Sequence, residues 1–125
     1  MILIIEDDPQ QSEIARTLLR HYGFDAVVAA SAERGLEIAR TREVSLALVD
    51  VHLLGMNGWE ASRIMKTDPA TSHIPLIVTS LYDIDRRMIA ASGCDLFLPK
   101  PWHVDALIGA VRKLVAEGRR PEPEG

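Results

Sequence analysis

Five short apolar runs alternate along the chain with longer segments that mix apolar and polar residues. The runs occupy residues 2–5, 26–29, 46–49, 76–78 and 96–98. Several of them are apolar at every position instead of at every second position, which is typical of strands that are buried on both faces. The pattern therefore predicts a parallel sheet whose two faces are both covered by helices.

The segment after the first run carries the signals of a helix start and a helix end. Asp8 is predicted to be the N-cap, with Pro9 at the first helical position and Gln11 completing a capping-box pattern. Gly23 is predicted to end this helix. The predicted apolar face of the helix comprises Ile14, Leu18, Leu19 and Tyr22.

Comparable signals mark four more helices. Ser31 is predicted to cap the second helix, and Asn57 with Glu60 forms a capping-box pattern for the third. A short fourth helix is predicted to begin at Asp83 and to end at Gly93. The fifth helix has the clearest apolar stripe, which comprises Val104, Leu107, Ile108, Val111, Leu114 and Val115.

The predicted order of elements is a strand followed by a helix, five times. This alternation predicts right-handed β-α-β units and an α/β fold with a doubly wound parallel sheet. Five strands favour the flavodoxin-like order 2-1-3-4-5 over the six-stranded dinucleotide-binding order. The chain is interpreted as one domain over residues 1–117, followed by a flexible tail or linker stub over residues 118–125.

Composition narrows the class of protein. The 125 residues suit one domain, and 14 Lys and Arg against 18 Asp and Glu give a net charge of −4. Proteins that bind nucleic acid through its phosphates usually carry a basic excess, so direct nucleic-acid binding is not expected. A single cysteine excludes an internal disulfide. Because the sequence shows no membrane-spanning apolar stretch and no signal peptide, a cytoplasmic protein is expected.

Carboxylates follow two of the predicted strands, at the edge of the sheet where doubly wound folds bind their ligands. Glu6 and Asp7 follow the first strand, and Asp50 follows the third. Since these two strands are neighbours in the predicted order, the three carboxylates are expected to converge. Like charges in one crevice repel each other, and hard oxygen ligands favour Mg²⁺.

Hydroxyl and ammonium groups follow the last two strands. The fourth strand ends in Thr79 and Ser80, whose hydroxyls can donate hydrogen bonds to an anion. Lys100 follows the fifth strand and is expected to pair with Asp50. The predicted edge of the sheet therefore combines acids, hydroxyls and one amine.

Four segments carry these residues: ILIIEDD at 2–8, LVDVHLLGMNG at 48–58, IPLIVTS at 74–80 and FLPKP at 97–101. In this order and spacing they resemble the response-regulator receiver domains of bacterial two-component signalling. The resemblance covers nearly the whole chain, from Met1 to about Glu117. It implies the same doubly wound fold.

The resemblance also implies a phosphoryl-acceptor site with a metal ion. Asp50 resembles the acceptor, and Glu6 and Asp7 resemble the acidic pair that binds Mg²⁺, or Mn²⁺ in its place. Asp50 itself and the backbone carbonyl of His52 would complete the protein ligands.

Three further positions match residues that respond to the phosphoryl group in the family, and a fourth matches a proline beside them. Thr79 resembles the hydroxyl that follows the phosphoryl group on activation, and Lys100 resembles the lysine that pairs with its oxygens. Phe97 stands at the position of an aromatic switch residue. Pro101 matches the proline whose preceding peptide bond is usually cis.

Some positions depart from the family pattern or vary within it. Leu54 stands four residues after the acceptor, where most members have proline, so the rigidity of this loop is in question. His52 and Leu81 occupy two positions that influence how fast the phosphoryl group is lost. Trp59 and Trp102 are expected near the site without a part in its chemistry.

The sequence therefore leads to the hypothesis of a phosphorylation switch instead of an enzyme with turnover. Its phosphodonor would be a sensor histidine kinase or a histidine phosphotransfer protein. Its output would be contact with a downstream protein through the face formed by the fourth helix, fifth strand and fifth helix. The sequence leaves open whether the domain is a monomer or a weak dimer.

Three alternatives explain the sequence less well. Mg²⁺-dependent phosphatases with an aspartate nucleophile usually carry this aspartate after the first strand, with a second Asp two residues later. In this chain the candidate aspartate, Asp50, follows the third strand, and the residue two positions later is His52. A flavodoxin-like electron carrier needs a phosphate-binding loop after the first strand, where Glu6 and Asp7 would repel the phosphate. A receiver-like scaffold that is never phosphorylated would not need the set formed by Asp50, Thr79 and Lys100.

Overall fold

The computed structural model describes residues 1–118, in which five strands alternate with five helices. The strands are β1 (Ile2–Ile5), β2 (Ala26–Ala29), β3 (Leu46–Asp50), β4 (Leu76–Ser80) and β5 (Leu96–Pro99). The helices are α1 (Pro9–His21), α2 (Ala32–Thr41), α3 (Gly58–Thr67), α4 (Arg87–Ser92) and α5 (Val104–Gly118). No helix within residues 1–118 has the length and apolar character to span a membrane.

The structure describes only the first residue of the segment predicted to be a tail. Gly118 is the last residue of α5, so the helix includes the first predicted tail residue. The rest of the predicted tail, residues 119–125, lies outside the described residues.

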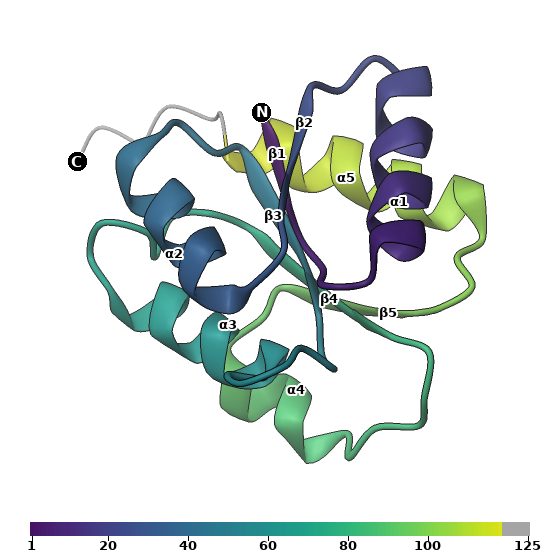
Figure 1. Cartoon of the computed structure of the whole chain (residues 1–125). Helices are drawn as coiled ribbons and strands as arrows, with labels where there is room; N and C mark the ends of the chain where they lie inside the picture. The colour runs from purple at the N-terminus through teal and green to yellow at the C-terminus, as the bar shows by residue number, and fades with distance from the viewer. Residues whose placement is uncertain (119–125) are drawn as a thin grey trace.

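All five strands are parallel and lie in the order β2-β1-β3-β4-β5, which confirms the predicted flavodoxin-like α/β topology (Figure 1). The register pairs Asp50 of β3 with Thr79 of β4, and Ser80 of β4 with Pro99 of β5. Because parallel strands end at the same edge of a sheet, the segments that follow β1, β3 and β5 meet there.

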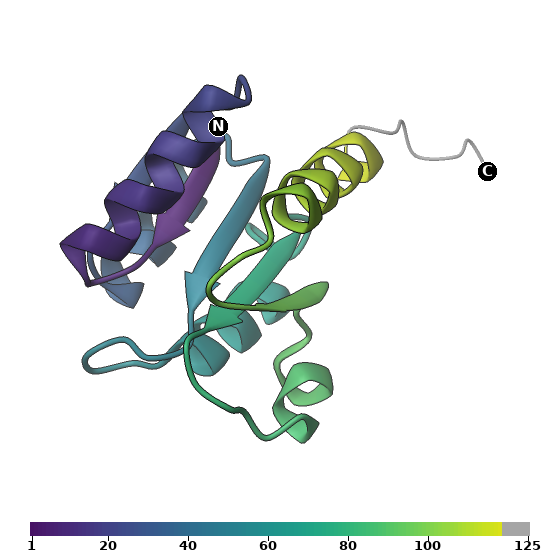
Figure 2. The same cartoon turned by 90° about the vertical axis from the view of Figure 1, so that its right-hand side faces the viewer.

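The helices cover both faces of the sheet, so the described part of the chain has two hydrophobic cores. Helices α1 and α5 pack on one face, and Figure 2, in which that side faces the viewer, shows both in front of the strands. Helices α2, α3 and α4 pack on the other face. Strands β1, β3 and β4 are buried at every position, which explains their unbroken apolar runs.

Helix α1 begins as predicted, but its capping box is only half formed. The carboxylate of Asp8 accepts hydrogen bonds from the backbone N–H groups of Gln10 (2.9 Å) and Gln11 (3.5 Å). The backbone N–H of Asp8 donates to the carboxylate of Glu6 (3.4 Å) instead of to a Gln11 side chain. The prediction of a reciprocal box with Gln11 is therefore wrong.

Ser31 and Asn57 cap α2 and α3 as predicted, although the capping box of Asn57 with Glu60 is only half formed, and the predicted start of α4 is wrong. Ser31 and Asn57 accept hydrogen bonds from backbone N–H groups in the first turns of α2 and α3. Helix α4 begins at Arg87 instead of near Asp83, because Asp85 binds the backbone N–H and the guanidinium of that arginine. The helix ends at Gly93, in the left-handed conformation, as predicted.

Two residues assigned to apolar helix faces are exposed instead of buried. Ile14 of α1 is 55% exposed and Val104 of α5 is 38% exposed, while Ala15 and Leu19 bury the sheet-facing side of α1. Both exposed residues line a groove between α1 and the segment that joins β5 to α5. The helical period places both residues on the apolar side of their helices, but it cannot distinguish the face toward the sheet from the neighbouring face.

Helix α3 starts so close to the end of β3 that its first residue must be glycine. A Cβ atom on Gly58 would lie 2.1 Å from the carbonyl oxygen of Asp50 and 2.9 Å from the Cα of Val51. The backbone N–H of Gly58 also donates a hydrogen bond of 2.9 Å to the carbonyl of Val51. The backbone position of Asp50 therefore depends on this approach.

We expect Gly58→Ala to destabilise the domain by about 1–3 kcal/mol, because the added methyl group overlaps backbone atoms that cannot rotate away. Gly109→Ala in α5 is the matched control, because its Cβ atom would meet nothing within 4 Å. The control should gain about 0.5–1 kcal/mol from the higher helix propensity of alanine. Urea denaturation measures the free energy of unfolding of both variants. If both substitutions change this free energy by the same amount and in the same direction, the close approach of Gly58 to the backbone of Asp50 is contradicted.

Candidate phosphoryl-acceptor site

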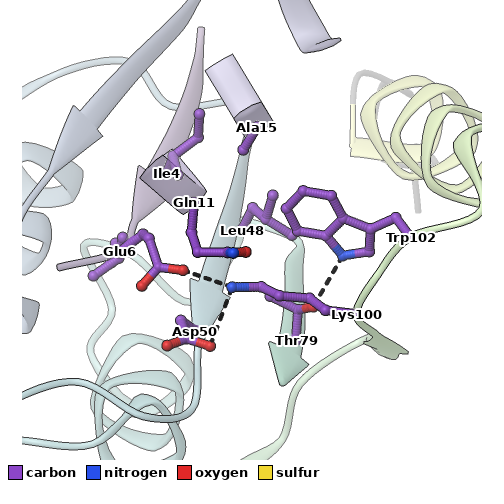
Figure 3. Close-up of a pocket in the computed structure, with 10 residues that line it drawn as sticks. Ile4, Glu6, Gln11, Ala15, Leu48, Asp50, Thr79, Lys100 and Trp102 are labelled. Atoms are coloured by element: carbon purple, nitrogen blue, oxygen red, sulfur yellow. Dashed lines mark hydrogen bonds and ion pairs between the residues drawn. The ribbon is translucent and has the colours of Figure 1, made fainter. Parts of the chain in front are cut away.

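The carboxyl edge of the sheet brings together four side chains that the sequence singled out. Glu6 follows β1 directly, Asp50 ends β3, Thr79 lies in β4 and Lys100 follows β5. All four line a cavity of about 10 Å³ (Figure 3), about the volume that one water molecule requires. The strand order therefore places groups from four segments around one small space.

Three carboxylates form a cluster, of which Glu6 and Asp50 line the cavity and Asp7 lies beside them. One oxygen each of Glu6, Asp7 and Asp50 lies within 4.8 Å of the other two. Glu6 and Asp50 are buried and Asp7 is half-buried. Oxygen donors at this spacing can hold a hard divalent cation, which would also relieve the repulsion between them.

Lys100 provides the positive charge that the cluster receives from the described side chains. Its side chain is 4% exposed, and its Nζ donates to Glu6 Oε1 (2.5 Å) and approaches Asp50 Oδ1 (3.5 Å). Burial raises the pKa of the Glu6 carboxyl above its ordinary value, although the hydrogen bond and the charge of Lys100 act in the opposite direction. One ammonium for three carboxylates leaves the cluster incompletely neutralised.

The two hydroxyls at the end of β4 have different partners. The indole Nε1–H of Trp102 donates a hydrogen bond of 2.9 Å to Thr79 Oγ1, beside the cavity (Figure 3). Ser80 Oγ accepts from the backbone N–H of Tyr82 (3.0 Å) and donates to the carbonyl of Tyr82 (3.1 Å). Thr79 therefore belongs to the cavity, whereas the Ser80 hydroxyl holds the following turn.

The loop after β3 contacts the acidic cluster through Leu54. The backbone N–H of Leu54 donates a hydrogen bond of 2.9 Å to Asp7 Oδ2. Proline, which the resemblance favours at this position, has no N–H and could not make this bond. The departure from the family pattern thus provides a direct link between the loop and a carboxylate of the cluster.

Three other predicted residues lie outside the cavity. His52 is exposed, and its ring lies edge-on to that of Tyr82 with 5.0 Å between the centroids. Leu81 is 49% exposed and lines the groove beside α1. The peptide bond between Lys100 and Pro101 is cis.

Phe97 lies on the opposite face of the sheet from Thr79. Its half-buried ring packs in the α2–α4 core, tilted by 30° against Trp59 at 6.1 Å. Thr79 binds Trp102, which belongs to the α1–α5 core. The two predicted switch residues are therefore on neighbouring strands, but their side chains enter different layers.

The sequence does not reveal the roles of two residues of the cavity, although it predicts that Trp102 lies near the site. Gln11 was interpreted only as a capping residue, and Trp102 was given no role, yet both line the cavity. The available signal for Trp102 was its place two residues after Lys100, as an aromatic side chain with a hydrogen-bond donor. Its partner in β4 depends on the folded chain and leaves no trace in local spacing.

The chain is similar to known proteins in sequence and in fold. Residues 2–112 match the family described as the response regulator receiver domain. The chain belongs to this family.

Relatives of this receiver domain include a regulator that is much longer than this chain and regulators of about the same length. The DNA-binding response regulator MtrA of Mycolicibacterium smegmatis is 34% identical over 125 residues, covering 98% of this chain and 52% of MtrA. The chain thus spans about half the length of that relative. The polar-differentiation response regulator DivK of Brucella ovis is 25% identical over 118 residues, covering 93% of this chain and 96% of DivK.

Solved structures share the fold of the receiver domain. The signal receiver domain of a signal transduction histidine kinase from Syntrophus aciditrophicus has a TM-score of 0.89 at 25% identity, over 99% of this chain and 96% of that one. The receiver domain of sensor histidine kinase PA1611 from Pseudomonas aeruginosa PAO1 has a TM-score of 0.84 at 21% identity, over 92% and 96%. The latter structure contains a magnesium ion coordinated in its active site cleft.

We expect Asp7→Asn to stabilise the receiver domain by about 1–3 kcal/mol in buffer with EDTA, because it removes one of three like charges. The asparagine retains a side-chain oxygen that can accept from the Leu54 N–H. Asp25→Asn, at an exposed acid before β2, is the control and should change stability by less than about 0.5 kcal/mol. A metal-free Asp7→Asn protein less stable than wild type would show that the carboxylates do not repel one another.

Proposed function

We propose that this receiver domain is a phosphorylation switch in which Asp50 accepts a phosphoryl group. The donor would be the phosphohistidine of a sensor kinase or of a phosphotransfer protein. An oxygen of Asp50 attacks phosphorus, the new O–P bond forms as the N–P bond breaks, and the donor histidine leaves as neutral imidazole after taking up a proton from water. The observation that carries the proposal is the position of Asp50 at the end of β3, between two other acids and Lys100.

The partners of the three carboxylates favour Asp50 as the nucleophile. Glu6 accepts the short hydrogen bond of Lys100, and Asp7 accepts the backbone N–H of Leu54. Asp50 has the longer contact with Lys100, at 3.5 Å. Its carboxylate is therefore less engaged than those of its neighbours and better able to attack.

The cofactor we propose is Mg²⁺, or Mn²⁺ in its place. The carboxylates of Glu6, Asp7 and Asp50 and the backbone carbonyl of His52 would hold it. When bound, the cation supplies positive charge against the negative charge that collects when a phosphoryl group joins this cluster. Lys100, whose Nζ lies 3.5 Å from Asp50 Oδ1, would supply further positive charge.

The phosphoryl group would then attract the Thr79 hydroxyl and the Lys100 ammonium. A charge-assisted hydrogen bond contributes about 1.5–3 kcal/mol, whereas moving an equilibrium from 1:99 to 99:1 needs about 5.5 kcal/mol. Thr79 therefore cannot drive the transition alone, and Lys100 and the cation must contribute. His52 and Leu81, beside the site, would influence the lifetime of the phosphoryl group.

We propose that the output is a change in protein contacts. The responding surface would be the face formed by α4, β5 and α5, which the half-buried Phe97 borders. The domain would act there as a cytoplasmic regulator without turnover, as a monomer or weak dimer, and without binding nucleic acid itself. The net charge of −4 agrees with a protein partner instead of a nucleic acid.

We expect acetyl phosphate to add one phosphoryl group to the wild-type domain when Mg²⁺ is present and none when EDTA replaces it. Intact-mass measurement followed by peptide mapping should locate the modification at Asp50. Asp50→Asn should abolish it. Asp8→Asn is the matched control, because asparagine also caps helices and should leave the modification intact.

Two results would overturn this proposal. One is modification of the Asp50→Asn protein to the wild-type extent, which would assign the acceptor to another residue. The other is full modification of the wild-type protein in EDTA, which would remove the need for a cation.

A further inference from the structure

Thr79 binds a partner on the side away from Asp50. The indole Nε1–H of Trp102 donates a hydrogen bond of 2.9 Å to Thr79 Oγ1. Figure 3 shows this hydroxyl pointing toward the indole and not toward Asp50. Thr79 is only 2% exposed, so its hydroxyl depends on a partner within the protein. In the unphosphorylated state that partner is Trp102.

The two aromatic neighbours of β4 lie on different faces of the sheet. Phe97 packs with Trp59 in the α2–α4 core, whereas Trp102 packs in the α1–α5 core. Side chains alternate along a strand, and Ile77, two residues before Thr79, also faces the α1–α5 core. A rotation of the Thr79 hydroxyl therefore affects Trp102 first, because the two side chains share a hydrogen bond.

Trp102 lines both the acceptor cavity and a larger apolar groove, as do Gln11 and Lys100. The groove, which we name the α1–α5 groove, has a volume of about 640 Å³ and is lined by residues that include Ile14, Leu18, Leu81 and Val104. Trp102 lines both spaces. The ammonium of Lys100 also lies 5.6 Å from the centre of its ring. One side chain thus contacts both groups proposed to bind the phosphoryl oxygens.

We propose that Trp102 is a positioning residue that holds the Thr79 hydroxyl in its resting orientation and transmits its release to the α1–α5 groove. This inference rests on the proposed phosphorylation of Asp50. When Thr79 turns its hydroxyl toward the phosphoryl group, the indole N–H loses its acceptor. A buried donor without an acceptor is unfavourable, so the half-buried ring shifts toward the groove, where water can accept the hydrogen bond.

The first test compares affinities for beryllofluoride, which mimics a phosphoryl group, in the presence of Mg²⁺. Trp102→Phe keeps an aromatic ring between the cavity and the α1–α5 groove but removes the N–H group that favours the resting state. It should bind the mimic about 2- to 10-fold more tightly than wild type, since a neutral hydrogen bond of typical strength is lost from the resting state only. NMR titration of the Val51 amide measures the affinity.

The same substitution in a Thr79→Val background separates positioning from packing. Valine has the shape of threonine but no hydroxyl, so Trp102→Phe should then leave the affinity unchanged. An equal effect of Trp102→Phe in both backgrounds would mean that the ring acts by packing alone, and would overturn the inference.

The second test follows the indole N–H directly by NMR in a Trp59→Phe protein, where Trp102 is the only tryptophan. Adding beryllofluoride and Mg²⁺ should shift this resonance and speed its exchange with water. Methyl signals of Ile14 in the groove should shift with it. In a Thr79→Val, Trp59→Phe protein the indole resonance should already lie near its released position and should move little further.

The outcomes distinguish this inference from the proposed function. If the Val51 amide shifts while the indole resonance stays in place, Thr79 keeps its bond to Trp102 and the inference is wrong, although phosphorylation at Asp50 stands. If neither resonance responds, the mimic does not bind beside Asp50, and both the proposed function and this inference fail.

Discussion

A buried ammonium between two buried carboxylates is the interaction on which the proposed acceptor site depends. Lys100 reaches Glu6 and Asp50 from the far end of the chain, across 94 and 50 residues respectively. Removing carboxylates from water is costly, and the raised pKa of Glu6 reflects that cost. With Asp7 added, the negative charge exceeds what one lysine offsets. This excess makes the site suited to a cation and, with it, to a phosphoryl group.

The fold supplies this charge arrangement by ending parallel strands at one edge. Strand β1 delivers Glu6 and β3 delivers Asp50 at neighbouring positions, and the close start of α3 at Gly58 fixes the backbone of Asp50. The Leu54 N–H ties the intervening loop to Asp7. Thr79 thus lies within β4, whereas Glu6, Asp7 and Lys100 lie in the segments that follow β1 and β5.

The sequence was sufficient to predict the strand order and the carboxylate cluster, because both follow from local pattern and from the rule that parallel strands end together. It could not predict contacts that depend on which helix face meets which neighbour. Ile14 has helical spacing but lines a groove, and Trp102 meets Thr79 only after β4 and the segment following β5 lie side by side. The Leu54 contact likewise involves a backbone N–H, which no residue pattern reports.

The most direct test of this account is the unfolding free energy of Lys100→Met, measured in EDTA and in excess Mg²⁺ beside wild type. Breaking a buried ion pair costs about 3–5 kcal/mol, so the variant should lose about that much without metal. Since the uncompensated carboxylates then favour a cation more strongly, Mg²⁺ should stabilise the variant more than it stabilises wild type. An equal gain from Mg²⁺ in both proteins, or an undiminished stability of the variant in EDTA, would contradict the view that Lys100 and the cation balance the same charge.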